Sequence, residues 1–109
     1  MAIKANIVID QGTTFQTSIN VTDENDNVVD LTGYSASAQM RKHYTSSNSF
    51  AFSTSISPTL GIVTLSMTAN TTNTITPGRY MYDCELTDIN GAVTRLVEGI
   101  VTVTPGVTR

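Results

Sequence analysis

Polar and apolar side chains alternate along most of this chain. In residues 15–21, Phe15, Thr17, Ile19 and Val21 occupy every second position, and Gln, Ser or Asn stands between them. The same alternation runs through residues 34–40, 50–56, 63–67, 80–87 and 97–103. Successive side chains of a strand point to opposite faces, so the pattern predicts strands with one buried and one hydrated face. Residues 3–9 add a first strand.

Turn-forming residues separate these segments. They are the polar loop 23–27, the Leu31-Thr32-Gly33 turn, Pro58 with Gly61, Pro77-Gly78, and Asp88-Ile89-Asn90-Gly91. Short strands with turns at intervals of roughly 8–12 residues, in a chain near 100 residues, predict an all-β, immunoglobulin-like antiparallel β-sandwich of about seven to eight strands. We expect one domain over residues 1–109, with a flexible arm at 104–109 and at most one helical turn within 69–75.

Several residues within the strands carry more specific expectations. Gly99 in the last strand indicates a β-bulge or a close approach of another backbone. Leu96 does not fit the alternation of residues 97–103 that follows it, and this also favours a bulge. Cys84 shares a face with Tyr82 and Leu86, so we expect all three side chains to pack in the core.

The charge content narrows the classes of partner. Only 14% of the residues are charged, against roughly 25% in an average domain, while 19 Thr and 10 Ser take their place. The net charge is −3 and the six basic residues are scattered, so we expect no nucleic-acid binding. No apolar run approaches the roughly 20 residues that cross a bilayer, so no membrane partner is expected. A Thr- and Ser-rich surface can be covered by another protein without burying unpaired ions.

Candidate catalytic and metal-binding residues are few. His43 is the only histidine, and the chain has no nucleophile-elbow spacing to accompany it. His43 and Cys84 lack further ligands at zinc spacing, and the acidic loop 23–27 lacks the central Gly of a calcium loop. We therefore predict no catalytic residue, no metal site and no cofactor.

Two further carboxylates lie on one strand. Asp83 and Glu85 share a face because they are two residues apart, and Arg95 stands at a suitable register on the next strand. We expect exposed ion pairs at this position rather than acid–base chemistry.

Several stretches together carry a family resemblance. They are Gln11–Phe15, Val29–Tyr34, Thr68–Thr72, Pro77–Tyr80 and Arg95–Val103. With them, the chain resembles small virion proteins of tailed bacteriophages, particularly those of cyanobacteria, over about residues 7–108. It is also similar to the immunoglobulin-like domain at the N-terminus of phage baseplate upper proteins. Unlike those proteins, it has no long extension after the last strand.

The resemblance implies a virion protein, made in the host cytoplasm, that acts as a decoration or adaptor subunit. Its expected partners are neighbouring capsid, tail, baseplate or fibre proteins, and we expect a homo-oligomer or many copies on the particle. Strand exchange through residues 3–9 and the C-terminal tail is our hypothesis for the contact. The predicted interface residues are Ile3, Ile7, Ile9, Tyr44, Val107 and Arg109.

An alternative function is a carbohydrate-binding module for adhesion to the host surface. Such sites present exposed aromatic side chains, and this chain has no Trp. Tyr44, in the loop after His43, is the candidate for that contact.

Overall fold

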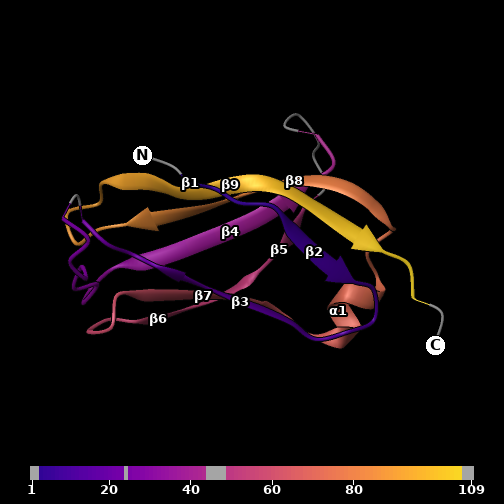
Figure 1. Ribbon diagram of the computed structural model, residues 1–109, viewed down its shortest axis with the longest axis horizontal. Coiled ribbons are helices and arrows are strands. Elements are labelled where there is room, and N and C mark those ends of the chain that lie inside the picture. Colours follow the sequence, from indigo (N-terminus) through magenta and orange to yellow (C-terminus); the bar gives the residue numbers. More distant parts are fainter. Residues whose placement is uncertain (1–2, 24, 44–48, 107–109) are drawn as a thin grey trace.

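The chain folds into two β-sheets that pack face to face. The computed structural model describes residues 3–23, 25–43 and 49–106, and within them it contains nine strands and one short helix (Figure 1). The strands are β1 (Ile3–Lys4), β2 (Ile7–Asp10), β3 (Phe15–Asn20), β4 (Ser35–Arg41), β5 (Phe50–Ala51), β6 (Ser53–Ser57), β7 (Ile62–Met67), β8 (Gly78–Thr87) and β9 (Val93–Thr104). The helix α1 (Ala69–Asn73) follows β7. The prediction of an all-β sandwich is confirmed.

The two sheets differ in size. The large sheet has the order β1-β9-β8-β4-β5, with β2 also paired to β9, and the small sheet has the order β3-β7-β6. All pairs are antiparallel except those of β1 and β2, which run parallel to β9. This detail differs from the predicted antiparallel pairing. It arises because β2 and β9 both run toward the end of the molecule where α1 lies (Figure 1).

The strand count exceeds the predicted seven to eight because two segments are interrupted. The first segment breaks at Ala5 and Asn6, between β1 and β2. The second breaks at Phe52, where the chain leaves the large sheet and continues as β6 in the small one. Phe52 stays anchored at this crossing, since its N–H donates to the carbonyl of Ala38 at 3.0 Å and its side chain is buried.

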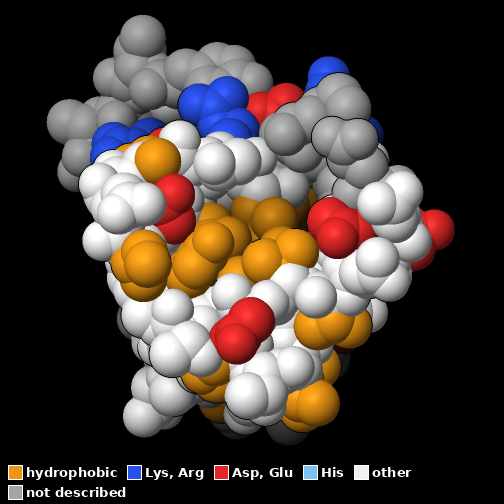
Figure 2. All heavy atoms as spheres, turned by 90° about the vertical axis from the view of Figure 1, so that its left-hand side faces the viewer, with side chains coloured by type: hydrophobic (Ala, Val, Ile, Leu, Met, Phe, Trp, Pro, Cys, Tyr) orange, Lys and Arg blue, Asp and Glu red, His pale blue; other side chains and the backbone are white. Residues whose placement is uncertain are grey.

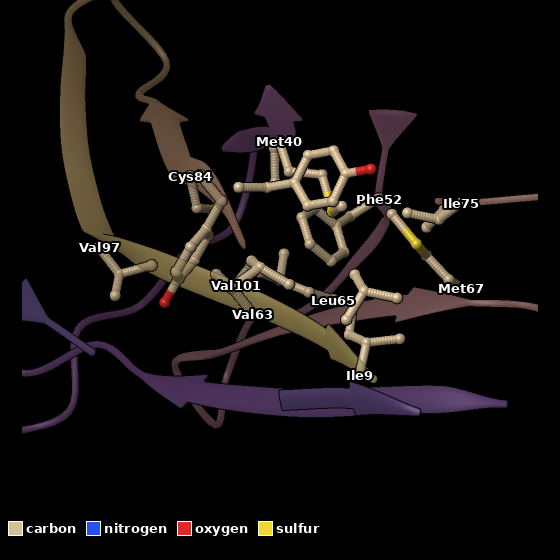
Figure 3. Close-up of a cluster of buried hydrophobic side chains, with 14 of the residues drawn as sticks. Ile9, Met40, Phe52, Val63, Leu65, Met67, Ile75, Cys84, Val97 and Val101 are labelled. Atoms are coloured by element: carbon tan, nitrogen blue, oxygen red, sulfur yellow. The ribbon is translucent and has the colours of Figure 1, made fainter. Parts of the chain in front are cut away.

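The core lies between the sheets and contains the inward face of each alternating strand (Figure 3). Met40, Cys84 and Val101 come from the large sheet, whereas Val63 and Leu65 come from the small sheet. Each fully buried aliphatic side chain of this kind contributes roughly 1.5–3 kcal/mol.

Aromatic side chains complete this core. The rings of Phe52 and Tyr82 meet edge to face with their centroids 6.1 Å apart, which joins the crossing strand to β8. Tyr80, Tyr82 and Cys84 are all buried, as the alternation predicted.

The irregular positions of β9 are those that the sequence indicated. Cys84 is paired with Val97 but Glu85 with Arg95, so Leu96 is the extra residue of a bulge. A Cβ on Gly99 would overlap the carbonyl oxygen of Ala5 and lie 2.8 Å from its carbonyl carbon. Gly99 thus permits the N-terminal segment to lie directly against β9.

The short helix closes the end of the sandwich opposite the β8–β9 hairpin. Thr68 caps it by accepting a hydrogen bond from the Thr71 N–H at 3.3 Å. The buried Thr72 hydroxyl accepts from the Gly12 N–H at 3.1 Å and donates to the Thr13 carbonyl at 2.7 Å. The helix therefore holds the turn between β2 and β3. In the described part of the chain no helix has the length and apolar character needed to span a membrane.

Candidate interaction surface

Three loops meet at one end of the sandwich. They are the β3–β4 loop (residues 21–34), the β6–β7 turn (58–61) and the β8–β9 turn (88–92). The Leu31 N–H donates to the Pro58 carbonyl at 3.0 Å, which joins the first two loops. Ile89 covers Gly33, where an added Cβ would lie 2.6 Å from the Ile89 Cγ2 atom. The loops thus form one continuous surface.

Three turns of this surface are each held by an aspartate side chain. Two of these turns lie in the β3–β4 loop, and the third is the β8–β9 turn. Asp23, Asp30 and Asp88 each use their Oδ1 atom to accept hydrogen bonds from residues just ahead in the chain. The donors are the N–H groups of Asn25 and Asn27 (2.8 and 3.0 Å), the N–H and hydroxyl of Thr32 (3.0 and 2.6 Å), and the N–H groups of Asn90 and Ala92 (2.8 and 2.9 Å). The hydroxyl and N–H of Thr32 lower the pKa of Asp30. The predicted turns at 23–27, 31–33 and 88–91 are confirmed.

Large apolar side chains are exposed among these turns. Val28, Leu60, Ile89 and Val93 have 58%, 62%, 70% and 59% of their surface exposed, and they are four of the six exposed large hydrophobic residues in the described ranges. Figure 2 faces this end, where hydrophobic side chains gather across the middle and acidic side chains lie around them. Contiguous apolar surface with a polar rim is typical of interaction sites.

The charged side chains of the three loops all have the same sign. The three loops contain no Lys, Arg or His, and their described acidic residues are Asp23, Asp26, Asp30 and Asp88. We call the four exposed apolar residues together with these four aspartates the acid-rimmed end. Because no cation belongs to the loops, this end attracts positively charged partners.

The acid-rimmed end could not be predicted from the alternation of polar and apolar residues. Its apolar members lie in separate turns, and only the topology brings them together. The sequence does contain an indication of exposed apolar side chains. Leu60 and Ile89 each lie in a turn, where polar residues are usual.

The predicted interface on the first strand needs a correction. Ile9 is fully buried and Ile7 is partly buried against the core, so their side chains face the small sheet and not a partner. The outward residues of β2 are Asp10 and Val8, and Val8 is 63% exposed. The side chain of Ile3 and the residues Tyr44, Val107 and Arg109 lie outside the described residues.

The predicted C-terminal arm is also partly attached to the sandwich. Thr104 is the last residue of β9, and the Gly106 N–H donates to the Gln11 side-chain oxygen at 3.2 Å. Gln11 in turn donates to the Ile75 carbonyl at 3.0 Å. Residues 104–106 are therefore no free arm.

A concave surface with a volume of about 580 Å³ lies on the outer face of the large sheet. Arg95 binds Asp83 there (Nε to Oδ2, 3.4 Å) and Glu98 (Nη1 to Oε2, 3.2 Å). The predicted pairing of Arg95 with Asp83 is confirmed, while Glu85 stands opposite Arg95 in the strand register. Opposite charges alternate here, so this surface has no dominant sign.

The chemistry available to the buried thiol is limited. Burial, together with the nearby negative charges of Asp83 and Glu85, raises the pKa of Cys84 to about 11. The thiol is therefore protonated at neutral pH and is a poor nucleophile. Among the described residues, no three His, Cys, Asp or Glu side chains are grouped so that they could hold a metal ion.

Aromatic side chains do not form a platform on the described surface. Phe52, Tyr80 and Tyr82 are buried, and Phe15, Tyr34 and Phe50 are partly buried. The predicted candidate for a sugar contact, Tyr44, lies outside the described residues.

No model of a known protein family matches the chain, and no curated protein matches it.

Proposed function

We propose that this chain is a non-enzymatic structural protein of a bacteriophage virion, a decoration or adaptor subunit that binds neighbouring virion proteins. The observation that carries the proposal is the acid-rimmed end, where exposed apolar side chains lie among four aspartates. The resemblance of the sequence to small virion proteins supplies the location.

As part of this proposal, we assign the sandwich to the immunoglobulin-like type. Three features support it. The sheets divide the strands unequally, the first strand runs parallel to the last, and the Tyr80 hydroxyl donates to the Thr76 carbonyl at 2.6 Å. A tyrosine near the start of the penultimate strand that bonds back to the preceding backbone is the tyrosine corner of immunoglobulin-like domains. Binding loops of such domains cluster at one end, as do the loops of the acid-rimmed end.

The proposed partner surface has an apolar centre and Lys or Arg at its rim. Burial of side chains that are now about 60% exposed stabilises the contact by roughly 1–2 kcal/mol each, with part of this offset by the entropy lost on association. A single contact of this size is weak. Many copies on one particle compensate through multivalency.

The outer face of the small sheet supports a second contact. Its outward residues carry no charge, because Ser, Thr, Asn and Gln occupy eight of nine positions and Ile62 the ninth. They are Gln16, Ser18, Asn20, Ser53, Ser55, Ser57, Ile62, Thr64 and Ser66. Such a face can be covered without desolvating an ion.

The test is incorporation into particles of a phage that encodes this chain. We expect mass spectrometry to find the chain in purified virions, and we expect the double variant Leu60→Ser/Ile89→Ser to be depleted from them. Thr59→Ala, an exposed change in the same turn as Leu60, is the matched control and should incorporate normally. A folded chain that stays in the infected-cell lysate and is absent from virions would refute the proposal.

A further inference from the structure

One edge of the small sheet has no neighbouring strand. In the described part of the chain, β3 pairs only with β7, so its other side is open. The Val21 N–H, directly after β3, donates to the Gly61 carbonyl at 2.7 Å and therefore points toward β7. In an antiparallel pair, the N–H and C=O of one residue point to one side and those of the next residue to the other. The N–H and C=O groups of Gln16, Ser18 and Asn20 consequently point away from β7.

The other edges in the described ranges are protected against pairing with a further strand. β1 and β5 contain two residues each, and β2 ends at the charged Asp10. β6 lies against β4, where the Thr54 hydroxyl donates to the Ala36 carbonyl at 3.0 Å, and Pro58 follows it directly. Short strands, charges and prolines are the devices by which proteins block pairing at an edge.

β3 has none of these devices. Its six residues include no charge and no proline, and its register with β7 contains no bulge. Gln16, Ser18 and Asn20 are exposed, whereas Phe15 and Ile19 are only partly buried against the core. A strand added at this edge would pair with the open backbone groups and cover the two apolar side chains.

The sequence around β3 matches itself when it is read in opposite directions from Ser18. Residues at equal distances from Ser18 share a chemical character. They are Thr17 with Ile19 (β-branched), Gln16 with Asn20 (amides), and Phe15 with Val21 (apolar). In an antiparallel pair centred on Ser18, each of these residues faces its counterpart in a second copy. Facing aromatic and β-branched residues stabilise a sheet, and no like charges face each other here.

The open backbone groups favour the same centre. Ser18 is the middle one of the three residues whose N–H and C=O groups point outward. A two-fold axis beside it therefore makes three residue pairs that each exchange two hydrogen bonds. Within β3, a register shifted by two residues keeps only two of these pairs. The backbone and the side chains thus select one register, and a second copy of this chain fits it.

We infer that this chain forms a symmetric dimer in which β3 of one copy pairs antiparallel with β3 of a second copy, centred on Ser18. The two small sheets then form one continuous sheet. The contact is isologous and closes on itself, so assembly through it stops at two copies. Because the two β3 strands run in opposite directions, the acid-rimmed ends lie at opposite ends of the dimer. The inference goes beyond the proposed function, since it depends on no other virion protein.

Sedimentation velocity of the full chain, at concentrations up to about 1 mM, tests the dimer. We expect a monomer–dimer equilibrium in this range, where weak contacts become populated. Hydrogen exchange measured by NMR tests the contact itself. The N–H groups of Gln16, Ser18 and Asn20 should exchange freely in the monomer and become protected as the concentration rises.

Charge variants test the register. Ser18→Lys and Ser18→Glu each place like charges opposite each other across the two-fold axis, so each should dimerise at least about fivefold more weakly than the wild type. An equimolar mixture of the two should form a heterodimer, because Lys then faces Glu. Ser55→Lys adds the same charge to the same outer face, two strands away on β6, and is the matched control that should dimerise normally. Circular dichroism of each variant establishes that it is folded.

A wild-type chain that stays monomeric overturns the inference, and so does a dimer in which the three N–H groups remain unprotected. Dimerisation that is unchanged in both Ser18 variants, or a mixture that forms no heterodimer, overturns it as well. A monomeric chain that is nevertheless found in virions overturns only the self-association. A chain that dimerises as described but is absent from virions overturns only the proposed function.

Discussion

Gly99 is the position at which a single methyl group should do the most damage to the N-terminal segment. The Ala5 carbonyl lies where a Cβ on Gly99 would be, and it accepts the Tyr82 hydroxyl at 2.7 Å. The Ala5 N–H donates to the Glu98 carbonyl at 2.9 Å. Gly99→Ala therefore cannot be accommodated unless Ala5 moves away from β9.

The size of the effect follows from the contacts that would be lost. Each of the two hydrogen bonds contributes about 1 kcal/mol, and a buried tyrosine hydroxyl left without a partner costs about 1–3 kcal/mol. We expect Gly99→Ala to lower the free energy of unfolding by about 2–4 kcal/mol. The φ angle of Gly99 is not in the left-handed region, so alanine adds no backbone strain of its own.

Urea unfolding, followed by circular dichroism, measures this change. Gly91→Ala is the matched control, because Gly91 has a φ of 86° but no atom within 4 Å of an added Cβ. It should cost only about 1–2 kcal/mol, through backbone strain. Tyr82→Phe removes the hydroxyl alone and should lie between the wild type and Gly99→Ala. A Gly99→Ala variant as stable as the wild type would refute the close approach of Ala5.

Three further changes test the buried polar groups. Tyr80→Phe removes the hydrogen bond to the Thr76 carbonyl and should destabilise the fold by about 1–2 kcal/mol in urea unfolding; an unchanged midpoint would contradict this role. Thr72→Val keeps the shape of the side chain but leaves the Gly12 N–H without its acceptor. We expect it to lower the free energy of unfolding by about 2 kcal/mol, and an unchanged stability would contradict this role of Thr72. The folded-state pKa of Cys84 is raised from 9.0 to about 11. The unfolded chain therefore loses the thiol proton first, and stability should fall between about pH 9 and 11, by at most about 3 kcal/mol. Cys84→Ala should remove this component of the pH dependence, and an identical alkaline profile in that variant would argue against it.

Local patterns predicted the elements well because the strands are half-buried. Alternation at residues 15–20 and 78–87 places the core residues correctly, since each of these strands has one face on the other sheet. Leu96 and Gly99 could be identified because each interrupts that rhythm.

Long-range features could not be predicted in the same way. Alternation is identical in both sheets, so nothing in residues 50–57 indicates that the chain changes sheets at Phe52. Ile7, Val8 and Ile9 are consecutive apolar residues, and their pattern does not reveal which face is inward. Ile9 was therefore placed on the wrong surface.

The candidate surface could not be predicted without knowing how the strands are arranged in the two sheets. Leu60 and Ile89 are 29 positions apart in the sequence. Both of their turns adjoin the β3–β4 loop, the first through the hydrogen bond from the Leu31 N–H to the Pro58 carbonyl and the second through Ile89 packed over Gly33. Asp23, Asp26 and Asp88 lie in turns that the sequence predicted, and Asp30 directly precedes one, but their common location follows only from the order of the strands.

The most direct test of the central claim is oxidative footprinting by hydroxyl radicals, read by mass spectrometry. The chain is labelled once as isolated protein at low concentration and once within purified virions. If the acid-rimmed end is covered by another subunit, Leu60 and Ile89 should be oxidised far less in the particle than in isolation. Equal oxidation of both residues in the two states would contradict the claim.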